Sequence, residues 1–398
     1  MEARGRSARF SDYFGLEKNV VAVAGAMFLL AFGENLWKGF LPKYLQALGA
    51  PVVAIGLFGT VRDFLDGAYQ YPGGWIADRY GRRRALLLFV GLAAVGYVIY
   101  ALAPSWPFVL AGLLFGMAWT SMASPTLFAV VGDALPRERR AIGFTVQAIL
   151  KRLPVVVAPT LGGLAIAAYG VLRGVRLGLA ATVLLALVTL AVVARVRIPI
   201  VREPTPTNIR GVWRSLPKSL KWLLLSDVFI RTCEGLVDVF LVLYATEIVG
   251  VSAPRYGALI AIQMATAILV YVPASKIADR AGRKPFVIAT FLCFAAFPLA
   301  VVLSKSFLAL AAAFVVGGLR EVGEPARKAM IVDLSRPDLR ARSIGLYYLV
   351  RSAAIAPAAF TGGLLWKVRP STPFLVAGAV GIAGAVLFSA TVEERFAG

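Results

Sequence analysis

The sequence contains long apolar runs that recur along the whole chain, each roughly the length of one membrane crossing. A helix of about 20 residues spans the roughly 30 Å hydrocarbon core of a bilayer. Charged residues make up 16% of the chain, against about 25% in ordinary soluble domains. Because hydrocarbon offers no hydrogen bonds to the backbone, such runs must fold as helices that satisfy their own polar groups. The sequence therefore predicts an all-α, multi-pass membrane protein and excludes a soluble globular fold.

The apolar runs predict about twelve spanning helices, six in each half of the chain. The first six are expected at 19–45, 52–78, 85–102, 107–133, 142–168 and 177–194. The second six are expected at 221–248, 254–278, 285–303, 307–333, 344–366 and 373–392. A basic stretch with several prolines separates the two sets and predicts a linker. The expected organisation is a cytoplasmic N-terminal segment at 1–18, a six-helix bundle at 19–195, a cytoplasmic linker at 196–219, a second bundle at 220–392 and a cytoplasmic tail at 393–398.

The second half of the sequence repeats residues of the first half at a nearly constant spacing. The pairs 200 residues apart are Glu34 and Glu234, Phe40 and Phe240, Tyr44 and Tyr244, Pro125 and Pro325, and Asp133 and Asp333. Asp78 and Asp279 are separated by 201 residues. Such an offset, kept across several helices, indicates an internal duplication. Duplicated halves are typical of secondary transporters, whose substrate site lies between the repeats near mid-membrane.

The formal net charge is +21, and most Lys and Arg residues fall in the loops of one side. This is the positive-inside pattern, which predicts that both termini are cytoplasmic and that basic loops meet membrane lipid. It explains the charge without nucleic acid, so no nucleic-acid partner is expected. The chain has no His and two Cys, both inside apolar runs. No metal site, disulfide framework or cofactor is therefore expected. Residues 1–18 lack the features of a signal peptide, and we expect insertion into a prokaryotic-type cytoplasmic (inner) membrane.

Two related polar loops interrupt the apolar pattern, one in each half. They read Gly74-Trp-Ile-Ala-Asp78-Arg79-Tyr-Gly81-Arg82-Arg83 and Ser275-Lys-Ile-Ala-Asp279-Arg280-Ala-Gly282-Arg283. This pattern resembles the signature loop between the second and third helices of the major facilitator superfamily. The two six-helix halves and the basic linker extend the resemblance over nearly the whole chain, nearest to the twelve-helix proton-coupled antiporters. It implies a monomeric rocker-switch transporter with alternating access.

In that family such a loop is a conformational latch and not a substrate site. The resemblance assigns this role to Gly74, Asp78, Arg79, Gly81, Arg82, Arg83, Asp279, Arg280, Gly282 and Arg283. The alternative is an ordinary positive-inside turn. A second family feature is only partly present, because Ala158-Pro159-Thr-Leu-Gly162-Gly163 keeps the end of a Gly-rich antiporter motif but not its beginning. No Arg occurs between Pro107 and Asp133, where many drug–proton antiporters have one, and this weakens a strict drug–proton assignment.

Charged residues inside the expected helices are the functional candidates. Facing lipid at mid-helix costs about 2.5–3.5 kcal/mol, so these residues should face the protein interior. Glu34 and Glu234 lie near mid-membrane and are related by the repeat, and desolvation favours the neutral form that a proton carrier needs. The proton-coupling candidates are thus Glu34, Glu234, Asp63, Asp66, Glu321 and Glu324. The substrate-cavity candidates are Lys38, Trp119, Ser121, Lys151, Arg152, Arg231, Asp238, Arg320 and Arg351.

A structural reading of the same charges remains open. Residues three or four apart on one helix can neutralise each other. The pairs expected on this reading are Glu34 with Lys38, Arg231 with Glu234, and Arg320 with Glu324. On this reading three further charged residues would simply lie in the headgroup region at the cytoplasmic end: Asp227, Lys328 and Asp133.

Together these features predict a secondary active transporter of a small polar, charged or zwitterionic solute, working by proton-coupled efflux. Uptake or uncoupled facilitation of a small metabolite is one alternative. A non-transporting membrane sensor with the same fold is another. An enzyme is not expected, because the sequence offers no His, metal cluster or nucleophile–base constellation.

Overall fold

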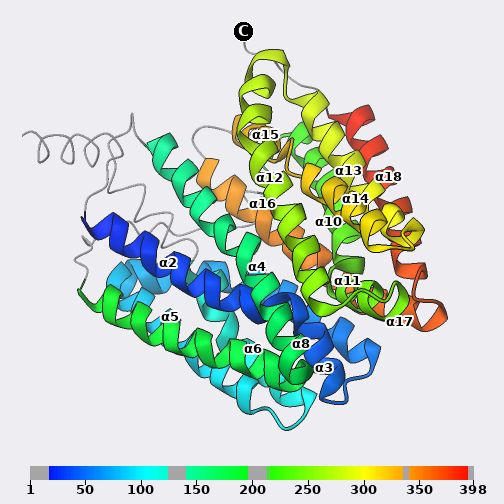
Figure 1. Cartoon of the computed structure of the whole chain (residues 1–398). Coiled ribbons are helices and arrows are strands. Elements are labelled where there is room, and N and C mark those ends of the chain that lie inside the picture. The colour runs from blue at the N-terminus through cyan, green and yellow to red at the C-terminus, as the bar shows by residue number, and fades with distance from the viewer. Residues whose placement is uncertain (1–17, 124–139, 196–212, 215, 335–339, 393–398) are drawn as a thin grey trace, which may run out of the picture. The chain divides into compact units, whose positions relative to one another are not determined.

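The computed structural model describes residues 18–123, 140–195, 213–214, 216–334 and 340–392 (Figure 1). Every regular element among these residues is helical, as the sequence predicts. The first half contains α2 (Lys18–Trp37), η1 (Lys38–Phe40), α3 (Leu41–Ala47), α4 (Val52–Tyr80), α5 (Arg82–Leu102), α6 (Trp106–Met117), η2 (Ala118–Met122) and α8 (Arg140–Arg195). The end of the expected fourth helix, with Pro125 and Asp133, lies outside the described residues.

The second half contains α10 (Lys218–Val237), η4 (Asp238–Phe240), α11 (Leu241–Leu243), η5 (Tyr244–Ile248), α12 (Ala253–Ala281), α13 (Lys284–Leu303), α14 (Phe307–Leu319), α15 (Glu324–Asp333), α16 (Arg340–Ile355), α17 (Ala358–Val368) and α18 (Thr372–Thr391). These elements follow the expected spans closely. The fifth and sixth spans are joined in α8, where Gly170 has a φ of 78° and interrupts the helical conformation. Gly readily adopts this positive φ, which other residues rarely do. The chain therefore turns at Gly170, and the single element α8 contains two spans.

Several spans that the sequence predicts as continuous helices are interrupted in the structure. The first and seventh spans each contain a 3₁₀ turn, at Lys38–Phe40 and Asp238–Phe240. The tenth span breaks between α14 and α15, and Pro325 stands in the first turn after the break. Proline cannot donate to the preceding turn, and its ring collides with that turn. These interruptions matter for the site because they change the direction of the charged side chains on either side.

The backbone repeats the duplication seen in the sequence. Helices α4 and α12 are both 29 residues long, and the glycines that follow them, Gly81 and Gly282, have φ angles of 89° and 102°. Residues with a Cβ rarely adopt such angles. The two glycines thus explain why both polar loops keep Gly at this position.

The chain divides into two compact units. The first unit comprises Met1–Gly39 and Leu65–Pro204, and the second comprises Phe40–Phe64 and Thr205–Gly398. In the first unit α2 and α5 pack on α8, and α6 packs on α5. In the second unit α18 packs on α10 and α13, and α12 packs on α14 (Figure 1). The start of α4 belongs to the second unit, where the Phe360 backbone N–H donates to Thr60 Oγ1 at 3.0 Å.

Corresponding glycines bring two helices together in each unit. A Cβ added at Gly162 would collide with the backbone carbonyl of Leu36, and a Cβ at Gly362 would collide with the carbonyl of Leu236. Both residues of the first contact are 200 positions before those of the second. Small residues at helix contacts allow the close backbone approach that holds membrane helices together. The fifth and eleventh spans therefore pack on the first and seventh spans in the same way.

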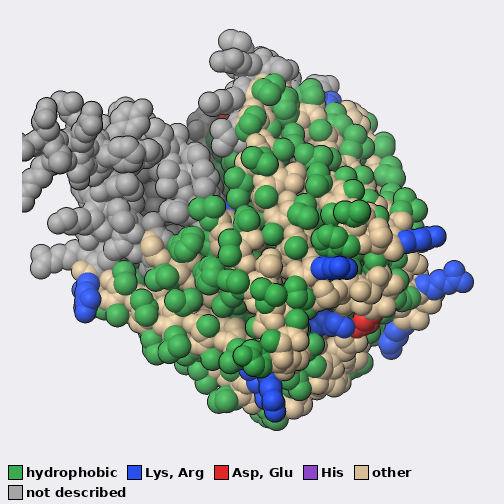
Figure 2. Space-filling model, viewed as in Figure 1, with side chains coloured by type: hydrophobic (Ala, Val, Ile, Leu, Met, Phe, Trp, Pro, Cys, Tyr) green, Lys and Arg blue, Asp and Glu red, His purple; other side chains and the backbone are tan. Residues whose placement is uncertain are grey.

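Large apolar side chains cover much of the outer surface. Leu102, Leu303 and Leu308 are each at least 75% exposed, and the face in Figure 2 is largely apolar with few charged side chains. Six described segments are long and apolar enough to cross a membrane by length and composition. They are Arg82–Leu102, Arg152–Arg195, Ala253–Tyr271, Lys284–Leu303, Ser343–Val368 and Thr372–Thr391. An exposed apolar surface of this extent fits a protein surrounded by lipid.

The glycine contacts give a prediction about stability. We expect Gly162→Ala and Gly362→Ala each to destabilise the protein by about 1–3 kcal/mol, because the added methyl group forces two helix backbones apart. Thermal unfolding of the purified protein in detergent measures the effect. Gly91→Ala is the matched control, since a Cβ at Gly91 meets nothing within 4 Å. If the control lowers the melting temperature as much as the other two variants, the proposed packing role is wrong.

Candidate functional site

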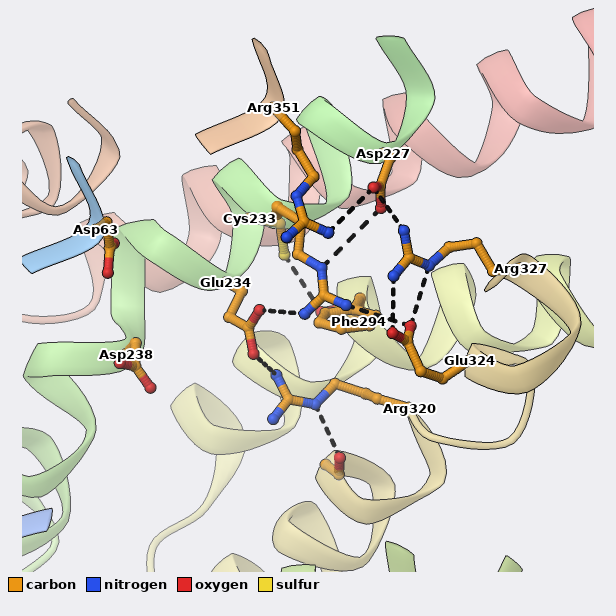
Figure 3. Close-up of polar contacts among 12 residues, drawn as sticks. Asp63, Asp227, Cys233, Glu234, Asp238, Phe294, Arg320, Glu324, Arg327 and Arg351 are labelled. Atoms are coloured by element: carbon orange, nitrogen blue, oxygen red, sulfur yellow. Dashed lines mark hydrogen bonds and ion pairs between the residues drawn. The ribbon is translucent and has the colours of Figure 1, made fainter. Parts of the chain in front are cut away.

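A set of charged residues from the seventh, tenth and eleventh spans of the second unit forms one connected network (Figure 3). Its centre is Asp227 on α10, whose side chain is 1% exposed. Asp227 Oδ2 accepts hydrogen bonds from Arg327 Nη1 at 2.6 Å, from Tyr347 Oη at 3.1 Å and from Arg351 Nη1 at 3.4 Å. Three spans, the seventh, tenth and eleventh, therefore meet at one carboxylate. A buried carboxylate needs this degree of pairing, because an isolated charge in an apolar interior is strongly destabilising.

Glu324 continues the network on α15. Its carboxylate accepts from Arg327 Nη2 at 2.7 Å and from Arg327 Nε at 3.0 Å. This is the two-pronged geometry in which Arg binds carboxylates most strongly. Arg231 Nη2 donates to the same carboxylate at 3.3 Å. Glu324 is 10% exposed and Arg327 is 2% exposed, so this part of the network is closed to solvent.

Glu234, on α10, stands at the more open end of the network. It accepts from Arg231 Nη1 at 2.8 Å and from Arg320 Nη1 at 3.4 Å. Its side chain is 30% exposed. The Arg231 guanidinium lies over the Phe294 ring, and the Arg320 guanidinium lies over Phe294 and Phe297 at 4.8 Å from each centroid. Aromatic faces attract cations by their quadrupole, so the two arginines are positioned partly by rings and not only by Glu234.

These ion pairs contain more positive than negative charge. The carboxylates of Asp227, Glu234 and Glu324 pair with Arg231, Arg320, Arg327, Arg351 and Lys328. Glu321 follows Arg320 and is half-buried, and its own polar interaction is outside this set of pairs. The arrangement suits a ligand that carries negative charge.

The carboxylates of the first unit have a different environment. Glu34 on α2 is 8% exposed and accepts hydrogen bonds from the Tyr97 hydroxyl and from Thr120 Oγ1. Asp66 on α4 accepts from Ser121 Oγ at 2.8 Å. Among the residues that the structure describes, no Lys or Arg lies within ion-pair distance of Glu34 or Asp66. The hydroxyls of Thr120 and Ser121 come from η2, a π-helical segment, and such segments occur frequently at functional sites.

A third charged group lies in the second unit at the start of α4. Arg62 pairs with Asp63 and with Asp238, both at 2.9 Å. A separate pair joins Lys43 on α3 to Glu247 on η5 at 2.8 Å. The periodicity of the sequence predicts Asp238 on one face of the seventh span with Asp227 and Glu234. The 3₁₀ turn at Asp238–Phe240 separates it from them, and Asp238 joins Arg62 instead.

The structural pairs expected from sequence are present only in part. Arg231 pairs with Glu234 as expected. The expected Glu34–Lys38 pair is absent among the described residues, because the 3₁₀ turn that begins at Lys38 ends the regular i,i+4 geometry. Arg320 pairs with Glu234 and not with Glu324, because the chain between Arg320 and Glu324 is a turn and not a helix. Asp227 is buried among its arginine partners and is not exposed to solvent.

The remaining candidates have varied surroundings. Trp119 is buried beside the hydroxyls of η2, Arg152 is half-buried, and Lys38 is exposed. The side chain of Lys151 lies outside the described residues. Sequence reasoning missed Tyr97, and it noted Arg327 as an intramembrane charge and Tyr347 as a possible hydrogen-bond donor without placing either among the site candidates. Arg327 was detectable from its i,i+3 spacing to Glu324, whereas the two tyrosines resemble ordinary core residues in the sequence.

The two signature loops also share their contacts. Arg83, at the start of α5, donates to the Ala194 carbonyl near the end of α8. Lys284, at the start of α13, donates to the Ser389 carbonyl near the end of α18 at 2.9 Å. A cation at a helix C-terminus satisfies free carbonyls and complements the helix dipole. In each unit a basic loop residue therefore joins the third span of the repeat to the sixth.

Further contacts hold the loop residues themselves. Arg82 is buried, the Arg79 guanidinium lies 5.3 Å from the Trp75 ring centroid, and Arg283 pairs with Asp333. A Cβ at Gly74 would meet nothing within 4 Å, so close packing does not explain this glycine. The side chains of Asp78, Asp279 and Arg280 lie outside the described residues.

Comparison with known families identifies the fold. The family model described as Major Facilitator Superfamily matches residues 23–232 and again residues 223–396. The chain belongs to the Major Facilitator Superfamily. Its all-α fold of two repeated halves, and its character as a multi-pass membrane transporter, follow from this membership.

Curated relatives are other transporters of the Major Facilitator Superfamily. The uncharacterized MFS-type transporter MJ1317 of Methanocaldococcus jannaschii is 24% identical over 94% of this chain and 94% of its own length. The enterobactin exporter EntS of Salmonella typhimurium is 29% identical, over 45% of this chain and 45% of its own length. The second match therefore concerns about half of each protein.

Solved structures of the Major Facilitator Superfamily show the same fold. The nucleoside transporter NupG aligns with a TM-score of 0.79 at 11% identity, covering 94% of this chain and 100% of that one. A POT family transporter in complex with 5-aminolevulinic acid aligns with a TM-score of 0.77 at 15% identity, covering 94% and 96%. The human organic anion transporter MFSD10 aligns with a TM-score of 0.68 at 17% identity, covering 93% and 98%. At these identities the likeness concerns the fold alone.

The buried network gives a second prediction about stability. We expect Arg327→Met to destabilise the protein by about 3–5 kcal/mol, because it leaves the buried Asp227 and Glu324 without their main partner. Lys328→Met also removes one positive charge that pairs with Glu324. Because Lys328 is 52% exposed, we expect this variant to lose only about 0–1 kcal/mol of stability. Thermal unfolding in detergent compares the two variants. Equal losses would contradict a structural role for the Arg327 pairs.

Proposed function

We propose that this transporter is a secondary active carrier of a small polar, charged or zwitterionic solute, and that it works by rocker-switch alternating access with proton-coupled efflux. The presence of buried charges in both units supports a solute that is itself polar or charged, because such residues are costly unless they are used or paired. Uptake and uncoupled facilitation are the alternatives within the same class. A membrane sensor with this fold is the alternative outside it.

The observation that carries the coupling proposal is the environment of Glu34. This carboxylate is buried, and its hydrogen-bond partners among the described residues are hydroxyl groups. A hydroxyl can donate to the charged carboxylate and can also accept from the protonated acid. Glu34 can therefore take up and release a proton without losing its partners. We assign it the first place among the proton-carrying candidates and Asp66, with its Ser121 partner, the second.

The carboxylates of the second unit take a lower rank as proton carriers. Glu324 and Asp63 each have an arginine within 3.0 Å that compensates their charge, and Glu234 lies between two arginines. Glu321 stays a candidate on sequence grounds. For the cavity we propose Trp119, Ser121, Arg231, Arg320 and Arg351, with Lys38, Lys151, Arg152 and Asp238 as the less supported members.

The relatives support the solute class more than the direction. A peptide transporter, a nucleoside transporter and an organic anion transporter share this fold, which agrees with a polar or charged solute. Efflux is favoured by the partial similarity to an enterobactin exporter. We further propose a monomer in the cytoplasmic membrane with both termini cytoplasmic, since the basic loops follow the positive-inside pattern.

The proposal predicts the behaviour of a Glu34→Gln variant. A thermal-stability screen of the purified protein with sugars, amino acids, organic anions and drugs first identifies a stabilising solute. In proteoliposomes that contain a pH-sensitive dye, this solute should drive proton movement through the unmodified protein, and Glu34→Gln should abolish it. Glu247→Gln, which removes a more exposed carboxylate paired with Lys43, should retain most of the flux.

Other results of this assay would overturn parts of the proposal. Solute flux without a pH response would indicate an uncoupled facilitator. Folded protein that moves no member of the panel would favour the sensor. Proton movement that survives in Glu34→Gln would exclude Glu34 as the coupling site.

The signature loops are proposed to act as conformational latches. We expect Asp78→Asn to reduce solute flux several-fold while the protein still inserts and folds, because the loop acts on the conformational change and not on insertion. Flux in proteoliposomes is compared with the melting temperature of the same preparation. Normal flux in Asp78→Asn would refute the latch role and leave an ordinary cytoplasmic turn.

A further inference from the structure

We propose that Arg231 and Arg320 form a binding site for an oxyanion group of the solute, a carboxylate or a phosphate, and that Glu234 occupies this site when no solute is bound. The inference rests on the proposed transport function and specifies which solutes that function concerns. In this arrangement the solute displaces the Glu234 carboxylate and takes over its hydrogen bonds. Glu234 is thus a positioning and competing group for the solute.

Glu234 is the carboxylate of the network that is easiest to displace. Its side chain is 30% exposed, against 1% for Asp227 and 10% for Glu324. Its bond to Arg320 is long, at 3.4 Å, and only its bond to Arg231 is short, at 2.8 Å. Glu324, by contrast, accepts two hydrogen bonds from the Arg327 guanidinium, from Nε and Nη2. Because Glu234 is the most exposed of these three carboxylates, a ligand that enters from solvent meets this end of the network first.

Arg320 keeps its position without Glu234. Its Nε donates to the Gly317 carbonyl at 2.8 Å, and its guanidinium lies over the Phe294 and Phe297 rings at 4.8 Å from each centroid. A guanidinium has five N–H donors, and the described contacts of Arg320 use one for Gly317 and one for Glu234. The remaining donors and the fixed orientation suit the planar, two-pronged recognition of an oxyanion.

The charge of the network favours a second anion. The ion pairs of the cluster place three carboxylates against four arginines and Lys328. The Asp227–Arg327–Glu324 part of the cluster is buried and joined by hydrogen bonds of 2.6–3.0 Å, so it can stay unchanged while Glu234 moves. The bound oxyanion would then compensate Arg231 and Arg320, and the displaced Glu234 would turn to the solvent-exposed side.

Equilibrium binding to the full-length protein tests this proposal. The purified protein in detergent is titrated with sodium phosphate and, separately, with sodium glutamate, at constant ionic strength maintained with sodium chloride. Ligands that bind only the folded state raise the melting temperature, and at least one of the two probes should do so. The probe that binds shows whether the site prefers a phosphate or a carboxylate. Absence of stabilisation by both probes would overturn the proposal.

The variants distinguish competition from a merely structural role. Arg320→Gln should raise the half-saturating concentration of the probe about tenfold, as expected for loss of a charge-assisted hydrogen bond. Arg320→Lys keeps the charge and should weaken binding less. Glu234→Gln should lower the half-saturating concentration, because it removes the internal competitor. If Glu234→Gln weakens binding as Arg320→Gln does, Glu234 does not compete with the ligand and the proposal fails.

Lys328→Gln is the matched control for charge. Lys328 belongs to the same cluster but contacts Glu324 at 3.5 Å and is 52% exposed, so its loss should leave probe binding nearly unchanged. An equal loss in Lys328→Gln and Arg320→Gln would mean that net charge alone attracts the probe, which also overturns the proposal. Melting temperatures in chloride alone establish that each variant is folded. Because binding is measured without transport, its failure is distinguishable from failure of the flux assay.

Discussion

The pairing of buried charge is the interaction on which the second unit depends. Asp227 is 1% exposed in a bundle whose other side chains are largely apolar. Left unpaired there, a carboxylate would cost several kcal/mol. Arg327, Arg351 and Tyr347 reach it from two other spans. Because the buried Asp227 carboxylate needs these partners, the seventh, tenth and eleventh spans must pack together for the charge to be compensated.

The two halves of the duplicated chain surround the corresponding carboxylate with different side chains. Glu34 and Glu234 are 200 residues apart, yet the first is surrounded by hydroxyls and the second by guanidiniums. One cause is visible on the neighbouring span. Tyr97 donates to Glu34, whereas the corresponding part of α13 has Phe297 and Pro298, which have no hydroxyl. The Phe297 ring holds Arg320 instead. The two halves thus share a repeated backbone, while their side chains make a candidate proton site in one half and a candidate anion site in the other.

Features that depend on one segment at a time were predictable from the sequence. The spans follow from the length of the apolar runs, and the Gly81 and Gly282 turns follow from the duplicated loop. The pairing of charges was not predictable, because it depends on breaks in the helices. A regular helix through Arg320 and Glu324 would place them as an i,i+4 pair, but the turn between them sends Arg320 to Glu234. Likewise, regular periodicity aligned Asp238 with Asp227, and one 3₁₀ turn directed it to Arg62. Tyr97 carried no signal, since a tyrosine on a buried helix face is more often a core residue.

A carrier must keep its charges compensated both with and without its solute, since it changes conformation in both states. An empty site with two uncompensated arginines would carry the penalty of desolvated charge through every return step. If a rigid carboxylate satisfied both arginines fully, the site would have no hydrogen-bond donors or positive charge left to bind a solute. The Glu234 end of the network avoids both conditions. Arg320 is also held by the Gly317 carbonyl and the Phe294 ring, and Arg231 by Glu324 and the same ring, so Glu234 is not their only support. Their partner Glu234 is partly exposed, and its bond to Arg320 is long. An anion from solution can therefore replace Glu234 and neutralise the two arginines in its place.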